Sequence, residues 1–150
     1  SNFHIKTLPL LKKKYIDTGK VQLEFIDYPL DRLAVIAATL ARSIPTKDGY
    51  IEAVSILLKK QKQWAYSKNP VNELQSIAKL FGISSKKFND ISQNIPLMQE
   101  IVTKMEKESK NFDINSTPTF IVNDKYKISG ALSFKDFEKE LLKSINAKKS

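Results

Sequence analysis

The sequence predicts an α/β protein in which a long run of helices separates one strand from a later β-hairpin. Three observations support this fold class: alternation of apolar and polar residues at 21–25, helical spacing of apolar residues from Asp31 to about Phe112, and two short strand-like segments at 120–122 and 126–128. The 150 residues suffice for one compact domain with a substantial core.

The first element is expected to be a helix that is already under way where the chain starts. Its apolar residues recur on one face at Phe3, Leu8, Leu11 and Tyr15. Pro9 lacks a backbone donor and is expected to kink this helix, while Gly19 suits the left-handed position beyond its last turn. Residues 21–27 then form the predicted strand, with Glu24 facing solvent, and Tyr28-Pro29 ends it.

The central segment is expected to contain only helices. Signals for helix starts stand at Asp31, Asn69-Pro70, Ser84 and Pro96. Gly82 is expected to end the helix that begins after Asn69. Trp64 and Tyr66 are interpreted as packing residues of this segment, not as a ligand site.

The last part of the chain is expected to form a β-hairpin and a helix. Residues 120–122 and 126–128 are the strands, and Asn123-Asp124 between them favours a two-residue turn. Ser133 with Asp136 three residues later resembles a capping box. The helix that follows has a predicted buried stripe made of Phe134, Phe137, Leu141, Leu142 and Ile145.

The most distinctive segment leads into this hairpin and includes its first strand; it reads Ser116-Thr117-Pro118-Thr119-Phe120-Ile121-Val122-Asn123. An X-Pro bond is the one peptide bond for which the cis form costs little, and a small polar residue before a proline that opens an apolar strand is a natural place for it. We therefore expect a cis bond between Thr117 and Pro118.

Composition argues against several classes of function. The net charge of +9 comes almost entirely from lysines scattered over helix faces, with Arg32 and Arg42 as the only arginines, so nucleic acid is not an expected partner. With one histidine and no cysteine, the sequence offers no metal-ligand cluster, and it contains no glycine-rich phosphate loop, so no cofactor is expected. No apolar run approaches the roughly 18 residues of a membrane span.

Taken in order, these features resemble the DsbA family of thiol-disulfide oxidoreductases. Besides the segment Ser116 to Asn123, the resemblance rests on Phe3-His4, Leu8-Pro9, Lys14 to Val21, Asp27 to Asp31 and Ala41-Arg42. It implies a thioredoxin-like fold with an inserted helical domain. Residues 1–30 and 113–150 would form the thioredoxin-like part, and residues 31–112 would form the insertion.

In that family a Cys-Pro-x-Cys motif begins the first helix, and residues similar to Ser1-Asn2-Phe3-His4 follow it. This sequence contains no cysteine, so the resemblance implies that the catalytic dithiol and the first, central strand lie before Ser1, and that this chain holds no catalytic residue. Phe3 and His4 would lie near the dithiol, although a solvent-facing or capped helical histidine is an equal alternative for His4. The residues expected to bind the substrate are Ser116, Thr117 and Pro118.

The resemblance implies a parent protein that introduces disulfides into exported proteins, in the periplasm or another exported setting. Its partners would be cysteine-containing exported polypeptides and a membrane reoxidase, and this chain alone would be inactive. The dipeptide between the cysteines tunes the redox potential and is missing, so oxidase and isomerase are both open. The main alternative is a redox-dead thioredoxin-fold module that binds polypeptides, and a remote one is a helix-turn-helix DNA-binding protein built on Leu74 to Ser84.

Overall fold

The structure is a computed structural model that describes residues 3–147, and the chain divides into two compact units. One unit comprises Ser1–Phe25 with Lys107–Ser150, and the other comprises Ile26–Glu106. The first unit holds the β-hairpin and the helices at both ends of the chain, whereas the second is built from helices. Among the described residues, no helix is both long and apolar enough to cross a membrane.

The first unit begins with a helical segment whose turns vary in width. η1 (Phe3–Thr7) and η2 (Lys12–Ile16) are π-helical, and α1 (Leu8–Leu11) between them is α-helical. The predicted helix is therefore present, and its wide turns flank Pro9, which lacks the N–H that an α-helical turn uses. The segment ends as predicted, because Gly19 has a φ of +75° and donates a 3.0 Å hydrogen bond to the Ile16 carbonyl oxygen.

The hairpin consists of β1 (Thr119–Val122) and β2 (Tyr126–Ser129), which pair antiparallel in a two-stranded sheet. Asn123 and Asp124 have φ values of +54° and +57°, the left-handed conformation that tight hairpin turns favour. The register pairs Val122 with Tyr126, so three residues connect the strands instead of the predicted two. The third is Lys125, whose N–H donates a 3.2 Å hydrogen bond to the Val122 carbonyl oxygen and thereby joins the turn.

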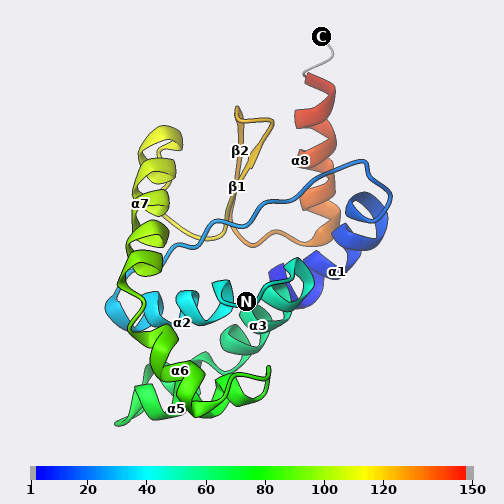
Figure 1. Cartoon of the computed structure of the whole chain (residues 1–150). Helices are drawn as coiled ribbons and strands as arrows, with labels where there is room; N and C mark the ends of the chain where they lie inside the picture. The colour runs from blue at the N-terminus through cyan, green and yellow to red at the C-terminus, as the bar shows by residue number, and fades with distance from the viewer. Residues whose placement is uncertain (1–2, 148–150) are drawn as a thin grey trace. The chain divides into compact units, whose positions relative to one another are not determined.

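The last helix, α8 (Phe134–Ala147), packs beside this hairpin (Figure 1). Its predicted cap is confirmed, because the Asp136 N–H donates a 3.2 Å hydrogen bond to Ser133 Oγ. Phe137 and Leu141 are each 4% exposed, as predicted, but Leu142 is 41% exposed and does not belong to the buried stripe. Successive helical residues are about 100° apart around the axis, so burial of Leu141 turns its neighbour away from the core.

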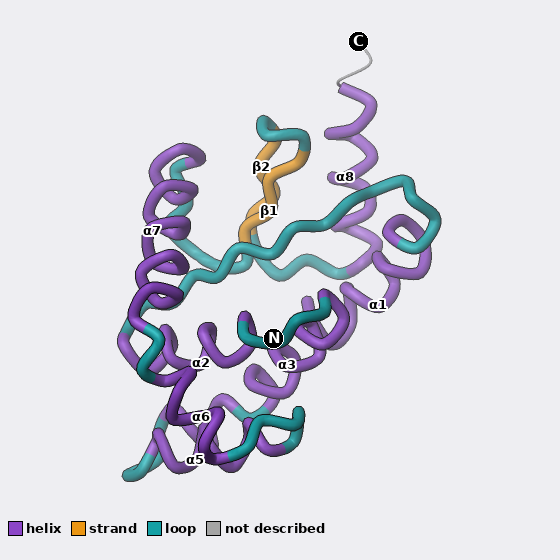
Figure 2. Tube along the Cα trace, in the orientation of Figure 1, coloured by secondary structure: helices purple, strands orange, loops and turns teal. Residues whose placement is uncertain are grey.

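Residues 21–30 are extended but belong to no helix and to no sheet that the structure describes (Figure 2). The predicted alternation is present, because Val21, Leu23 and Phe25 are half-buried whereas Gln22 and Glu24 are exposed. The prediction of a strand at 21–27 is nevertheless wrong. Alternation determines which side chains turn inward, but a strand also needs a neighbouring strand with which to exchange backbone hydrogen bonds.

The second unit is built from six helices: α2 (Arg32–Arg42), α3 (Lys47–Lys59), α4 (Gln61–Ala65), α5 (Pro70–Lys79), α6 (Ser85–Ser92) and the first part of α7 (Ile95–Phe112). Two predicted caps are confirmed. Asp31 Oδ1 accepts a 2.8 Å hydrogen bond from the Ala34 N–H, and Ser84 Oγ accepts a 3.2 Å hydrogen bond from the Lys87 N–H. Asn69 stands at the predicted start of α5, but its side chain makes no capping hydrogen bond.

The core of the second unit is formed by apolar side chains from several of these helices. The most deeply buried include Leu40, Leu74, Ile77 and Phe88, each at most 1% exposed. Trp64 is buried and its Nε1–H donates a 2.9 Å hydrogen bond to the Leu57 carbonyl oxygen, so its predicted packing role is confirmed. The same prediction for Tyr66 is wrong: this residue follows the end of α4 and is 84% exposed.

Candidate functional site

The loop that leads into β1 has the geometry expected from its sequence. The bond between Thr117 and Pro118 is cis. Thr119 Oγ1 donates a 2.7 Å hydrogen bond to the Ser116 carbonyl oxygen, and the Gly130 N–H donates a 2.9 Å hydrogen bond to the Pro118 carbonyl oxygen. Ser116 and Thr117 are exposed and Pro118 is half-buried. The loop is therefore held at its strand end and presents its first two residues to solvent.

The outer edge of β1 continues this loop with free backbone groups. Because Gly130 bonds to Pro118 and the register alternates along the pair, the N–H and C=O groups of Thr119 and Ile121 point away from β2. These groups have no backbone partner in the part of the chain that the structure describes. An extended polypeptide can add to such an edge through main-chain hydrogen bonds.

An aromatic cluster holds the start of the first helical segment against β1. Phe3 is 5% exposed, and its ring centroid lies 4.7 Å from that of Phe120 and 6.0 Å from that of Phe137. The rings of Phe120 and Phe137 are also 4.7 Å apart and meet edge to face. Because Phe120 follows shortly after Pro118, the cluster brings the N-terminal end of η1 close to the loop described above.

His4 lies next in the chain and is partly buried among aromatic rings. Its ring centroid is 5.7 Å from those of both Phe3 and Phe25. Nδ1 is buried and has no hydrogen-bond partner among the described residues. Burial lowers the pKa of the His4 imidazole below its ordinary value of 6.5, so the ring is neutral at pH 7. The side chain is therefore not solvent-facing, and its proximity to a dithiol stays a prediction.

Polar contacts fix the other end of the same helical segment to α8. The Tyr15 hydroxyl donates a 2.6 Å hydrogen bond to Glu138 Oε2, and Lys14 Nζ forms an ion pair with the same oxygen. Lys14 first, and Tyr15 second, lower the pKa of the Glu138 carboxyl, because both stabilise its charged form. The segment that begins at Phe3 is thus anchored to the hairpin side by its aromatic end and to α8 by its polar end.

Sequence reasoning missed a polar cluster in the second unit. Asp27 accepts two 2.6 Å hydrogen bonds, from Arg42 Nε and from the Tyr50 hydroxyl, and the Arg42 guanidinium lies 4.0 Å from the centroid of the Tyr50 ring. Burial first, and the charge of Asp27 second, raise the pKa of the Tyr50 hydroxyl well above its usual range. The available signal was indirect: a carboxylate that ends an apolar stretch, and one of only two arginines in the sequence.

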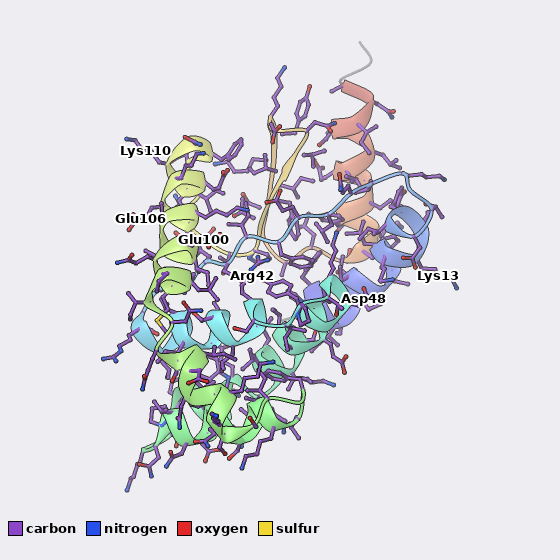
Figure 3. All side chains as sticks on the ribbon, viewed as in Figure 1. Lys13, Arg42, Asp48, Glu100, Glu106 and Lys110 are labelled. Carbon is purple, nitrogen blue, oxygen red and sulfur yellow. The ribbon has the colours of Figure 1, made fainter. Side chains whose placement is uncertain are left out.

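Asp27 and Arg42 also line a small pocket in the second unit. Its volume is about 120 Å³, and the remaining lining residues are Ile26, Leu97, Glu100, Ile101 and Lys104. Arg42 and Glu100 are labelled in Figure 3. Sites for small molecules usually measure about 300–1,000 Å³, so this pocket has room for a few water molecules and not for a cofactor.

The loop, the β1 edge and the aromatic cluster offer backbone groups and aromatic rings but no thiol. The sequence contains no cysteine, and the described residues hold no cluster of three or more metal-ligating side chains. Disulfide exchange requires a thiolate, which neither the loop nor the aromatic cluster supplies. The arrangement offers a backbone edge to which an extended polypeptide can add.

Comparison with known proteins adds independent information. A family model described as Thioredoxin matches residues 1–143. A protein of Rickettsia typhi with the name "Putative protein-disulfide oxidoreductase" is 30% identical over 121 residues, which are 81% of this chain and 45% of that protein. A protein of Rickettsia conorii with the same kind of name is also 30% identical over 121 residues, or 44% of its length. The chain therefore spans less than half the length of these curated relatives.

Solved structures agree with the sequence comparison. The crystal structure of Wolbachia pipientis alpha-DsbA1 matches with a TM-score of 0.83 and 27% identity, and the match covers 94% of this chain and 76% of that chain. A structure of the same protein with two cysteines replaced by alanine gives the same values. A match over 94% of the chain includes most of both units, the helical one as well as the one with the hairpin.

Proposed function

Since the chain belongs to the thioredoxin family and is DsbA-like in fold, we propose that it is part of a thiol-disulfide oxidoreductase that introduces disulfides into exported proteins. The thioredoxin-like fold expected from the order of the motifs is confirmed by the family model and the structural match. The catalytic dithiol would stand immediately before Ser1. The chain without that dithiol would be inactive in the reaction, because it contains no cysteine.

The proposed reaction moves two electrons from a substrate dithiol to a disulfide of the parent protein. A substrate thiolate attacks one sulfur of that disulfide, forms a mixed disulfide and releases the other sulfur as a thiolate. The second substrate thiolate then attacks the substrate sulfur of the mixed disulfide. The substrate leaves with a disulfide, the parent keeps two thiols, and the protons lost by the substrate are taken up by the parent. A membrane reoxidase would accept the two electrons afterwards.

One observation carries the placement of the dithiol: the Phe3 ring packs 4.7 Å from the Phe120 ring on β1. We therefore expect the dithiol of the proposed parent protein to stand close to Pro118, at the N-terminal end of a helical segment. Unpaired amides and the helix dipole at such an end stabilise a thiolate and make it a good leaving group. His4 would add no charge there, because its buried ring is neutral at pH 7.

We assign substrate binding to Ser116, Thr117 and Pro118. Exposure of Ser116 and Thr117 beside the cis bond supports pairing of their backbone with an extended polypeptide. The substrates would be cysteine-containing exported polypeptides. The periplasmic or other exported setting and the reoxidase are supported by likeness to DsbA proteins alone.

The test compares this chain with the longer protein that the proposal requires, produced from the gene with any coding sequence upstream of Ser1 included. The longer protein in its disulfide form and, separately, the chain alone are mixed with a reduced peptide that carries two cysteines, and disulfide formation is followed by mass spectrometry. We expect stoichiometric oxidation by the longer protein and none by the chain alone. The matched control is the longer protein with its upstream cysteines replaced by serine. An upstream sequence that lacks a Cys-x-x-Cys pair would overturn the proposal.

The lack of cysteine also favours a second candidate, a thioredoxin-fold module that binds polypeptides without exchanging disulfides. In this case the β1 edge would hold an extended polypeptide and no sulfur chemistry would follow. The same upstream codons separate the candidates. If they encode no cysteine pair and the chain still retains an unfolded, cysteine-free polypeptide, the binding module replaces the oxidoreductase.

A further inference from the structure

Positive charge is concentrated in one segment of the second unit. Residues 59–87 contain seven lysines and one carboxylate, Glu73, which gives this segment a net charge of +6 out of the chain's +9. Glu73 accepts a 2.8 Å hydrogen bond from Gln63, and no lysine of the segment forms an ion pair within the described part of the chain. The charge is therefore not compensated locally and projects a positive potential.

The turn between α5 and α6 combines this charge with an exposed apolar side chain. We call residues 79–87 the basic turn. Leu80 is 61% exposed, and Lys79, Lys86 and Lys87 in the same nine residues are exposed as well. A single exposed leucine needs no explanation, but this one shares nine residues with three lysines that form no ion pair among the described residues, so the segment offers an apolar side chain together with positive charge.

The basic turn is held in one conformation by its own backbone. Gly82 reverses the chain with a φ of +86°, and the Ile83 N–H donates a 3.1 Å hydrogen bond to the Ala78 carbonyl oxygen. Ile83 and Phe88 are 2% and 1% exposed and anchor the turn in the core. Presenting Leu80 to a partner thus requires no ordering of the turn, so little conformational entropy is lost on binding.

A similar composition occurs at the junction of α4 and α5. Tyr66 is 84% exposed and stands between the exposed residues Lys62 and Lys68. Tyrosine side chains have an apolar ring and a polar tip, and they are enriched where protein meets the headgroup region of a bilayer. Two exposed points of the same helical segment therefore pair a large side chain with lysines.

We propose that the basic turn docks on an anionic lipid surface. Leu80 would enter the boundary between headgroups and acyl chains, and the three lysines would contact lipid phosphates. Nucleic acid fits this surface less well. Residues 59–87 contain no arginine, the side chain that binds phosphate and guanine in bidentate fashion. An exposed leucine also finds no apolar surface to contact on a phosphate backbone.

The test measures partitioning of the 150-residue chain onto vesicles by co-sedimentation. One set of vesicles contains phosphatidylglycerol with phosphatidylcholine, and the other contains phosphatidylcholine alone. We expect binding to the anionic vesicles only, weakened by added salt. Replacing Lys79, Lys86 and Lys87 by glutamine should reduce partitioning about 100-fold, since each lysine near an anionic membrane contributes about fivefold. Leu80→Ala, which changes no charge, should reduce it about 10-fold.

Matched controls come from α8. Its lysines Lys135, Lys139 and Lys143 are exposed but alternate with carboxylates, so their replacement by glutamine makes the same change in net charge away from the basic turn. Leu142→Ala, also on α8, is the control for Leu80→Ala. Unchanged binding by the controls supports the proposal. Equal losses in both lysine triples, tighter binding to duplex DNA through the same residues, or no binding to anionic vesicles would each overturn it.

Discussion

At the scale of single residues, His4 is the group whose environment is easiest to measure. It is the only histidine in the sequence, so its proton resonances titrate without ambiguity. Burial lowers its pKa, and we expect a midpoint below 6.5 in the folded chain. The unfolded state therefore binds the proton more tightly than the folded state. As a result, the contribution of His4 to the free energy of unfolding is complete above pH 6.5 and is lost as the pH falls through the folded pKa. The control is the chain in denaturant, which should titrate near 6.5; a folded midpoint at or above that value would contradict the burial of the ring.

Asp27 accepts two side-chain hydrogen bonds in the polar cluster of the second unit. Its carboxylate is 13% exposed and accepts hydrogen bonds from both Arg42 and Tyr50. Asp27→Ala leaves both donors without this acceptor, and we expect the free energy of unfolding to fall by about 2–4 kcal/mol. Denaturant titration measures this change. Asp90→Ala removes an exposed carboxylate of α6 and should stay within about 0.5 kcal/mol of the parent, so equal losses in the two variants would refute the role of Asp27.

Tyr50 belongs to the same cluster and should make the stability of the chain depend on pH in the alkaline range. Burial and the nearby Asp27 carboxylate raise its pKa above the ordinary value of 10.0, so the folded state favours the neutral phenol. The part of the free energy of unfolding that comes from this raised pKa is complete below pH 10 and declines as the pH rises above 10. Tyrosinate absorbance should show Tyr50 ionising only when the chain unfolds. Tyr50→Phe should be less stable at neutral pH but should lose less stability above pH 10 than the parent; identical slopes would argue against a buried phenol.

At the scale of elements, the sequence predicts local features such as helix caps and turns, but it does not predict which segments pair as strands. The caps at Asp31 and Ser84 and the left-handed pair Asn123-Asp124 are confirmed, because each depends on residues within three positions. The alternation at 21–25 was also right, yet the predicted strand was wrong, since no sequence pattern states whether a partner strand is present. The prediction that Leu142 is buried was wrong for a related reason. Hydrophobicity alone does not determine the exact edge of a buried helical stripe.

Gly82 allows a direct test of how α5 ends. Its φ of +86° lies in the left-handed region, where a Cβ atom is unfavourable although no neighbouring atom stands within 4 Å. We therefore expect Gly82→Ala to reduce the free energy of unfolding by about 1 kcal/mol through backbone conformation alone. Chemical denaturation measures this loss. Ser76→Ala, on the exposed face of α5, is the control and should change stability by less than about 0.5 kcal/mol.

At the scale of the whole molecule, the candidate site was predictable where it is continuous in sequence. The segment from Ser116 to Asn123 could be recognised from its own residues, and so could the hairpin that begins within it. The cluster around Asp27 could not, because its partners are 15 and 23 residues away and are brought together by packing of the second unit. The contact between Phe3 and Phe120 depends on an even longer separation, and only the family resemblance indicated that both lie at one site.

The unpaired edge of β1 should govern how the chain behaves in solution. Outward-pointing N–H and C=O groups of Thr119 and Ile121 can pair with the same edge of a second copy, so we expect association that increases with protein concentration. Sedimentation velocity over a concentration series measures it. Ile121→Lys places a charge on this edge and should shift the distribution toward monomer, whereas Ser76→Lys adds the same charge on α5 and should not. A chain that stays monomeric at every concentration, or an equal effect of both lysines, would show that this edge does not drive association.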